Sequence, residues 1–211
     1  MPGLMRFFLD SASAEEARRV REWGLLDGVW LSAAAAQAVE LDYRRAVRDV
    51  ASVCDGPVCV QPAAGDAKGM YKDARELAKL GKDIVVQLPV TPNGMRVARL
   101  LAEDQIAVCA SGCHSAVQAL IAAKANVAYL APAVGPLDEM GAIGMDLVEQ
   151  VIRIYDNYGF QTQILVSEVR NPVHVLDAAL MGADVATIPP GLFEQLYRHP
   201  LTEELLAARE K

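Results

Sequence analysis

The sequence has no extended run of lysine or arginine, and its formal net charge is −7 at pH 7. Surfaces that bind nucleic acids or anionic membranes are usually basic, so we expect neither kind of partner. Hydrophobic residues make up 53% of the chain, but the apolar runs fall far short of the ~20 residues that cross a bilayer. Small neutral or cationic molecules remain as partners that the charge permits.

Cysteine is scarce, and its spacing lacks the paired pattern of a structural zinc site. The cysteines are Cys54, Cys59, Cys109 and Cys113. Residues 1–10 carry no basic region followed by a small-residue cleavage site, so we expect a cytoplasmic protein. Reduced thiols are the simplest state in that compartment. We therefore expect no metal and no other cofactor.

Short apolar runs recur along the chain, and a stretch with helical spacing follows each one. The runs occupy residues 4–9, 28–31, 58–61, 83–88, 106–109, 127–131, 161–166 and 184–188. The helices are expected near residues 13–23, 43–54, 66–80, 92–103, 115–124, 140–158, 172–181 and 191–198, with a terminal helix near 201–210. Ser13 with Glu16 fits a capping box, and Thr91 and Asn171 each precede a proline as helix caps do.

Eight consecutive strand–helix units with short connections fit a closed parallel barrel better than an open sheet. We predict an α/β fold of the (β/α)8 TIM-barrel type, as a single domain over residues 1–211 that ends in the terminal helix. Active sites of such barrels lie at the carboxyl ends of the strands. The last residues of each strand are therefore the candidates for function.

Four segments of the sequence match a known protein family most closely: GLLDGV at residues 24–29, residues 69–80, IVVQLPVT at 84–91 and IYDNYGF at 154–160. They resemble the small transaldolase and fructose-6-phosphate aldolase family. The resemblance implies the same barrel in a ring oligomer, a pentamer or a decamer of two pentamers, with the segment from Thr202 onward packing on a neighbour. It also implies a lysine that forms a Schiff base with a ketose, where this chain has Gln87. An amide nitrogen cannot form that bond because its lone pair is delocalised.

At the other strand ends, the chain keeps the family's site residues only in part. By resemblance, Asp10 matches an acidic residue that positions the substrate and its proton-transfer network. Gln61 stands where a glutamate is usual, and Ser111 keeps a hydroxyl where a threonine holds the catalytic water. Trp30 replaces a small hydroxyl residue and Ala133 replaces an aromatic one. We call the carboxyl end of the barrel interior the mouth. We expect the Trp30 indole to fill part of the space that the missing aromatic ring leaves there, so that the pocket is smaller.

The phosphate site implied by the resemblance is altered as well. Pro136 stands at one of its arginines and Glu168 at its serine, whereas Arg170 is kept. A carboxylate two residues from that arginine weakens its hold on a dianion. The lysines fall on predicted helices, before the fourth strand or at the terminus, so none of them replaces Gln87.

Three of the candidate residues keep two interpretations each. Cys109 is either a nucleophile or a buried packing residue. Glu168 is either a base or half of an ion pair with Arg170. His114 lies near a helix start, where it points either into the pocket or to solvent.

We expect catalytic roles for Asp10, Gln87, Glu168, Ser111 and Cys109, and substrate contacts from Trp30, Gln61, Ala133, Arg170 and His114. The first functional hypothesis is a repurposed enzyme that acts on a small non-phosphorylated carbonyl or hydroxy compound by carboxylate acid–base chemistry. The second is a catalytically inactive pseudoenzyme or structural oligomer. The third is a working transaldolase or fructose-6-phosphate aldolase, as the family resemblance alone suggests.

Overall fold

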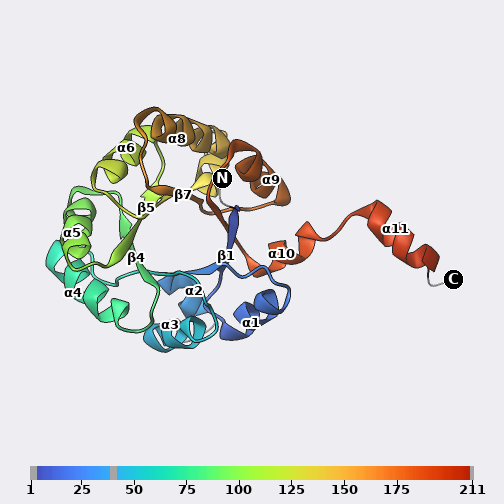
Figure 1. Ribbon diagram of the computed structural model, residues 1–211, viewed down its shortest axis with the longest axis horizontal. Helices are drawn as coiled ribbons and strands as arrows, with labels where there is room; N and C mark the ends of the chain where they lie inside the picture. The colour runs from blue at the N-terminus through green and yellow to red at the C-terminus, as the bar shows by residue number, and fades with distance from the viewer. Residues whose placement is uncertain (1–3, 39–41, 210–211) are drawn as a thin grey trace.

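The computed structural model describes residues 4–38 and 42–209, which form a closed barrel of parallel strands with helices outside (Figure 1). The strands are β1 (Arg6–Asp10), β2 (Gly28–Leu31), β3 (Val58–Val60), β4 (Ile84–Pro89), β5 (Ala107–Cys113), β6 (Tyr129–Pro132), β7 (Gln163–Val166) and β8 (Val185–Ile188). They follow one another in sequence order around the barrel, and β8 pairs with β1 to close it. The predicted TIM barrel is confirmed.

The helices lie on the outside of the barrel. They are α1 (Ala14–Glu22), α2 (Ala33–Ala38), α3 (Tyr43–Ala51), α4 (Ala67–Ala78), α5 (Pro92–Glu103), α6 (Ala116–Lys124), α7 (Val134–Glu139), α8 (Gly144–Tyr158), α9 (Pro172–Met181), α10 (Pro190–Leu196) and α11 (Pro200–Arg209). The sequence did not predict α2 and α7. Each is only six residues long, too short for a helical period to stand out.

The predicted helix starts form as expected, with one difference in α1. The side chains of Thr91 and Asn171 accept hydrogen bonds at the starts of α5 and α9. Ser13 accepts from the backbone N–H of Glu16, but the Glu16 carboxylate does not return to Ser13 as a capping box requires. It accepts instead from the Ser11 hydroxyl, which itself accepts from the Ser13 N–H at 2.9 Å.

Alternate residues of each strand pack either under the helices or inside the barrel. Because the strands are staggered, residues at one level inside the barrel come from every second strand. One level is entirely apolar and is formed by Phe8, Cys59, Cys109 and Leu165. These four side chains are all 0% exposed, so they seal the middle of the barrel.

Two further levels lie above this seal, toward the carboxyl ends of the strands. We call the lower one the floor; it consists of Trp30, Gln87, Ala131 and Thr187. We call the upper one the rim; it consists of Asp10, Gln61, Ser111 and Ser167. Polar side chains therefore appear in the floor and rim, at the end of the strands where active sites of TIM barrels generally lie.

The end of β5 differs from the sequence prediction. The strand was expected to stop at Cys109, but it runs on to Cys113. Its pairing with β6 shifts register between Ala110 and Cys113, where Gly112 has a φ of +64°. A bulge of this kind depends on cross-strand pairing and leaves no simple sequence pattern. As a result Cys109 lies within the strand, and Ser111 occupies the rim.

Candidate functional site

Asp10 ends β1 at the rim and is partly buried. Its pKa is raised from 3.8 to about 6, first by burial and then by the charge of Glu168, against a lowering effect of Arg170. Ser13 caps α1, so the carboxylate of Asp10 is not used as the helix cap. A carboxyl group with a pKa near neutrality can both accept and donate a proton under physiological conditions.

Glu168 and Arg170 lie on the loop that follows β7, close enough to Asp10 to affect its pKa. Arg170 forms ion pairs with Glu168 at 3.1 Å and with Glu139 of α7 at 3.3 Å. The ion-pair interpretation of Glu168 is therefore realised in the structure. A Cβ on Gly135 would come within 2.6 Å of the Arg170 Nε, so only glycine permits this approach.

The backbone of Glu168 is in the left-handed region, with a φ of +59°. Left-handed geometry costs a non-glycine residue roughly 1–2 kcal/mol. Gln105 and Asn126 share it, but each directly follows a helix, where a left-handed residue is a common ending. Glu168 follows a strand, and such strain in a loop beside a carboxylate is characteristic of functional sites.

Gln87 is 2% exposed and lies in the floor. Its amide nitrogen donates to the carbonyl oxygen of Cys59 at 2.9 Å and, at 3.4 Å, to that of Leu31. The amide therefore ties β4 to the end of β2 and to the middle of β3. The oxygen Oε1 accepts no hydrogen bond from the described residues, so the group that Gln87 can offer a ligand is an acceptor.

Trp30 and Ala133 surround this region from β2 and from the residue after β6. Trp30 is partly exposed, and its side chain packs against the apolar residues inside the barrel. Ala133 is 5% exposed and forms a bridge to Ser167 of the rim. Five surface hollows, of about 260 to 570 Å³, are lined by residues outside the floor and rim.

Cys109 and His114 lie apart from the floor and rim. The Cys109 side chain is 0% exposed, and burial together with Cys59 raises its pKa well above the ordinary value. This geometry favours the packing interpretation, because a nucleophile needs an accessible thiolate. His114 follows β5 and is exposed, and its backbone N–H donates to Gln118 of α6 at 2.9 Å.

Tyr43 supports the mouth, although sequence reasoning did not single it out. Its hydroxyl donates to the carbonyl oxygen of Leu31 at 3.3 Å and accepts from the backbone N–H of Gln61 at 2.6 Å. Burial is the main cause that raises its pKa to about 12. The Gln61 side chain is exposed, so the backbone of Gln61 is fixed while its amide remains available.

Thr187 in β8 is the second residue that sequence reasoning missed. It is 1% exposed, and its Oγ1 is a buried side-chain oxygen with no hydrogen-bond partner among the described residues. It pairs with Phe8 of β1, so it lies one interior level below Asp10. Examination of the end of the eighth strand would have found it, since threonine is the polar residue of that apolar run.

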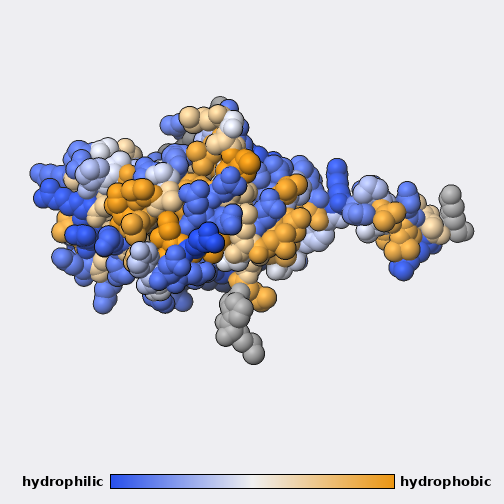
Figure 2. All heavy atoms as spheres, turned by 90° about the horizontal axis from the view of Figure 1, so that it is seen from above, coloured by the Kyte–Doolittle hydropathy of each residue, from blue (hydrophilic) through white to orange (hydrophobic). Residues whose placement is uncertain are grey.

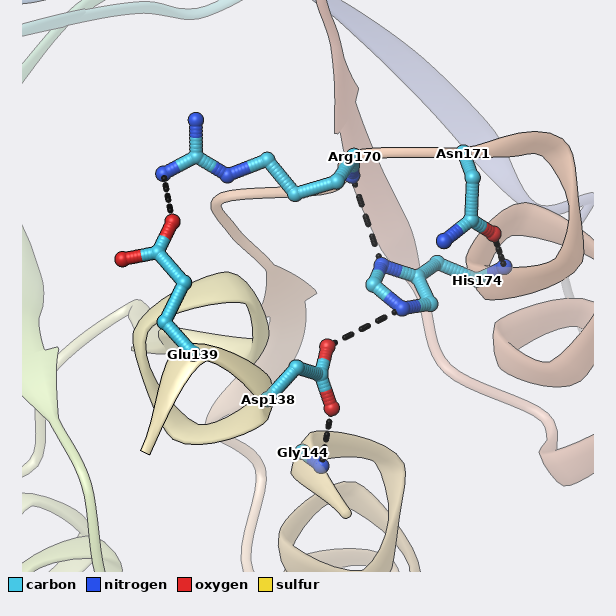
Figure 3. Close-up of polar contacts among 6 residues, drawn as sticks. All are labelled: Asp138, Glu139, Gly144, Arg170, Asn171 and His174. Carbon is cyan, nitrogen blue, oxygen red and sulfur yellow. Dashed lines mark hydrogen bonds and ion pairs between the residues drawn. The ribbon is translucent and has the colours of Figure 1, made fainter. Parts of the chain in front are cut away.

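A polar network behind the rim holds the Glu168–Arg170 loop in place (Figure 3). The backbone N–H of Arg170 donates to His174 Nδ1 at 3.3 Å, so the proton of a neutral ring lies on Nε2. His174 Nε2 in turn lies 3.1 Å from the Asp138 carboxylate, which also accepts from the backbone N–H of Gly144 at 2.8 Å. The network joins α7, α8 and α9 behind the loop.

The lysines of the described residues all lie outside the strands: Lys68, Lys72 and Lys79 in or beside α4, Lys82 just before β4, and Lys124 at the end of α6. Lys82 lines a hollow of about 430 Å³ at the amino end of the barrel, opposite the rim. No three His, Cys, Asp or Glu side chains within residues 4–38 and 42–209 gather so that they could hold a metal ion. In the same part of the chain, no helix is long and apolar enough to span a bilayer.

Comparisons with known proteins find similar sequences over nearly the whole chain. Residues 7–211 match the family described as Transaldolase/Fructose-6-phosphate aldolase. A protein from Hydrogenobaculum sp. named "Probable transaldolase" is 42% identical over 199 residues, which are 94% of this chain and 92% of that protein. Proteins of the same name from Aquifex aeolicus and Desulfosudis oleivorans are 41% and 43% identical over 199 residues, again 94% of this chain and 92% and 93% of their own lengths.

Proposed function

Because the chain belongs to the transaldolase/fructose-6-phosphate aldolase family, we propose that it is a repurposed member that acts without a Schiff base. Its substrate is a small non-phosphorylated carbonyl or hydroxy compound, and the chemistry is proton transfer by Asp10. The observation that carries the proposal is the raised pKa of Asp10, about 6, beside a floor that offers Gln87 and no lysine.

The position of Gln87 supports the loss of imine chemistry. A Schiff base needs a primary amine at the carboxyl end of the barrel, and none of the described lysines lies on a strand. The Gln87 nitrogen is also committed to two backbone carbonyl oxygens. What the side chain offers a substrate is an acceptor for a hydroxyl or amine hydrogen.

The mouth supplies the groups that enolisation of a hydroxy ketone requires. Asp10 as a carboxylate takes the proton from the carbon next to the carbonyl, the electrons of that C–H bond form a C=C bond, and the π electrons of the carbonyl group move to its oxygen. The hydroxyls of Thr187 and Ser111 are the donors at the floor and rim that can stabilise this oxygen. Once the proton on Asp10 has exchanged with solvent, its return to the same carbon gives hydrogen exchange. Its return to the former carbonyl carbon, after the substrate's hydroxyl proton has moved to the enolate oxygen, gives isomerisation.

The charge around Arg170 argues against phosphorylated sugars. Both Glu139 and Glu168 are paired with the guanidinium, at 3.3 and 3.1 Å. A phosphate dianion would have to displace these carboxylates or bind beside them, and like charges in close contact repel. These contacts therefore support a substrate without a phosphate group.

The test is exchange of α-hydrogens in D2O, followed by proton NMR with hydroxyacetone, dihydroxyacetone and fructose 6-phosphate. We expect exchange with the first two substrates, and a loss of 100-fold or more in Asp10→Asn. Glu149→Gln on the exposed face of α8 is the matched carboxylate control. Absence of exchange with all compounds supports the pseudoenzyme, and a borohydride-trapped adduct with fructose 6-phosphate supports the transaldolase.

Assembly is the second part of the proposal, and it rests on the family resemblance and on α11. This helix buries none of its residues and projects away from the barrel (Figure 1). Leu201, Leu205 and Leu206 are 54–68% exposed on it, and apolar atoms lie on the same projection in Figure 2. We expect a pentamer or decamer in which the segment from Thr202 packs on a neighbour, and a monomeric mass in solution overturns this. The cytoplasmic location stays a prediction.

A further inference from the structure

The Thr187 hydroxyl needs a partner that the described residues do not provide. A buried hydroxyl without a hydrogen bond is costly, and most such groups in folded proteins are satisfied. Thr187 lies in the floor, with its side chain inside the barrel and one level below Asp10. A donor or acceptor of a ligand seated on the floor would supply the missing partner.

A second open group lies on the same floor. Gln87 has both amide hydrogens directed to the carbonyl oxygens of Cys59 and Leu31, which leaves Oε1 as an acceptor. An acceptor is satisfied by a donor. The floor therefore favours a ligand that carries hydrogen-bond donors over a ligand that carries only acceptors.

The charge above the floor is negative. Asp10 and Glu168 approach closely enough for the charge of Glu168 to raise the pKa of Asp10, and this effect exceeds the opposite one of Arg170. Arg170 is shared with Glu139. One guanidinium therefore faces three carboxylates, and an anion entering the mouth meets a net repulsion.

Trp30 adds an aromatic surface to the same floor. An indole attracts a cation to its face, and an aromatic ring beside carboxylates is a common way to bind a small ammonium group. An ammonium group also carries three donors, which match the carboxylates, the Gln87 oxygen and the Thr187 oxygen.

We infer that the substrate of this mouth carries an ammonium group, and that it is a small amino carbonyl or amino hydroxy compound. The inference rests on the proposed function and names the class of its substrate. Asp10 keeps its role in proton transfer, while Glu168, Trp30 and the floor oxygens hold the cation.

The experiment compares three probes that share one carbon skeleton: aminoacetone, hydroxyacetone and hydroxyacetone phosphate, titrated calorimetrically at neutral pH. They differ only in a positive, a neutral or a negative group. We expect aminoacetone to bind at least 10-fold more tightly than hydroxyacetone, and we expect no binding of the phosphate. Glu168→Gln and Trp30→Leu should each reduce this preference at least 5-fold, whereas Glu149→Gln on α8 should leave it unchanged.

Equal or tighter binding of hydroxyacetone overturns the ammonium assignment and leaves the proposed function intact, since that is decided by Asp10-dependent exchange. Binding of none of the probes also overturns it. Tight binding of the phosphate overturns the assignment and contradicts the proposed function as well. A preference for aminoacetone that persists in both mouth variants places the cation elsewhere and overturns the site.

Discussion

The two ends of the barrel interior both contain polar side chains, and the buried side-chain oxygen that lacks a partner among the described residues, Thr187 Oγ1, lies toward the carboxyl end and not at the amino end. There the Arg6 guanidinium donates to Gln163 at 2.8 Å and to the Tyr129 hydroxyl at 3.3 Å. It also lies 5.7 Å from the ring centre of Phe8 and 5.6 Å from that of Tyr129. The charge is paired with hydrogen bonds and aromatic faces, so this end acts as a structural plug.

The carboxyl end carries unfavourable features instead. Asp10 has a raised pKa, Glu168 has a left-handed backbone and Thr187 has an unpaired buried hydroxyl. Each of these costs stability in the unliganded protein. The open groups lie at the end where we propose that the function lies.

The largest stability effect is expected at the plug. Arg6→Met keeps an apolar stem but leaves the Tyr129 hydroxyl and the Gln163 oxygen without their donor. Losing these charged hydrogen bonds and the cation–π contacts should lower the free energy of unfolding by roughly 3 kcal/mol. Urea unfolding at one fixed protein concentration measures it, with Arg18→Met on the exposed face of α1 as the control. A loss no larger than the control's shows that the plug is not structural.

The next largest effect is a gain in the free energy of unfolding, and it is expected at Asp10. Asp10 has a pKa of about 6 in the folded protein and 3.8 as its ordinary value, so the folded state binds the proton more tightly. Ionisation of Asp10 therefore reduces stability as the pH rises from about 4 through about 6. Asp10→Asn should raise the free energy of unfolding by roughly 2 kcal/mol at pH 8, and this gain should vanish below pH 4. A gain that does not depend on pH contradicts the assigned burial of the charge.

A smaller gain is expected from Glu168→Gly, because glycine adopts the left-handed conformation without strain. Roughly 1 kcal/mol should be gained in urea unfolding. Gln105→Gly at the amino side of the barrel is the matched control, since Gln105 has the same φ of 59°. Both variants should stabilise the chain, but only Glu168→Gly should weaken aminoacetone binding. Equal loss of binding in both variants would break the contrast between the two ends.

The barrel could be predicted from sequence because its signals are local. Each signal depends on a few neighbouring residues: a short apolar run, or a proline that follows Thr91 or Asn171 at a helix start. The end of β5 could not be predicted in this way, since the bulge at Gly112 arises from pairing with β6. Local pattern therefore gives the elements and leaves their exact ends open.

For the candidate site, the sequence offered a list of residues and not the contacts that they make. Asp10, Gln87 and Glu168 lie at or near the carboxyl ends of strands, and the family resemblance together with the strand-end rule selected them. The commitment of the Gln87 nitrogen to the Leu31 and Cys59 carbonyl oxygens depends on strands up to 56 residues apart. Likewise, a threonine in an apolar strand is typical of β-structure, and the lack of a partner for Thr187 emerges only when the barrel closes.

The smallest stability effect is expected at Thr187. Thr187→Val removes the unpaired hydroxyl and keeps the branched shape, so the free energy of unfolding should stay equal or rise by about 0.5 kcal/mol. If the hydroxyl contacts the ligand, the same variant should weaken aminoacetone binding several-fold, whereas Thr187→Ser, which keeps the hydroxyl, should largely retain it. Urea unfolding and calorimetric titration on the same preparations separate the two quantities. A variant that loses stability while it binds normally would show that the hydroxyl serves the fold, and the open end would then resemble the plug.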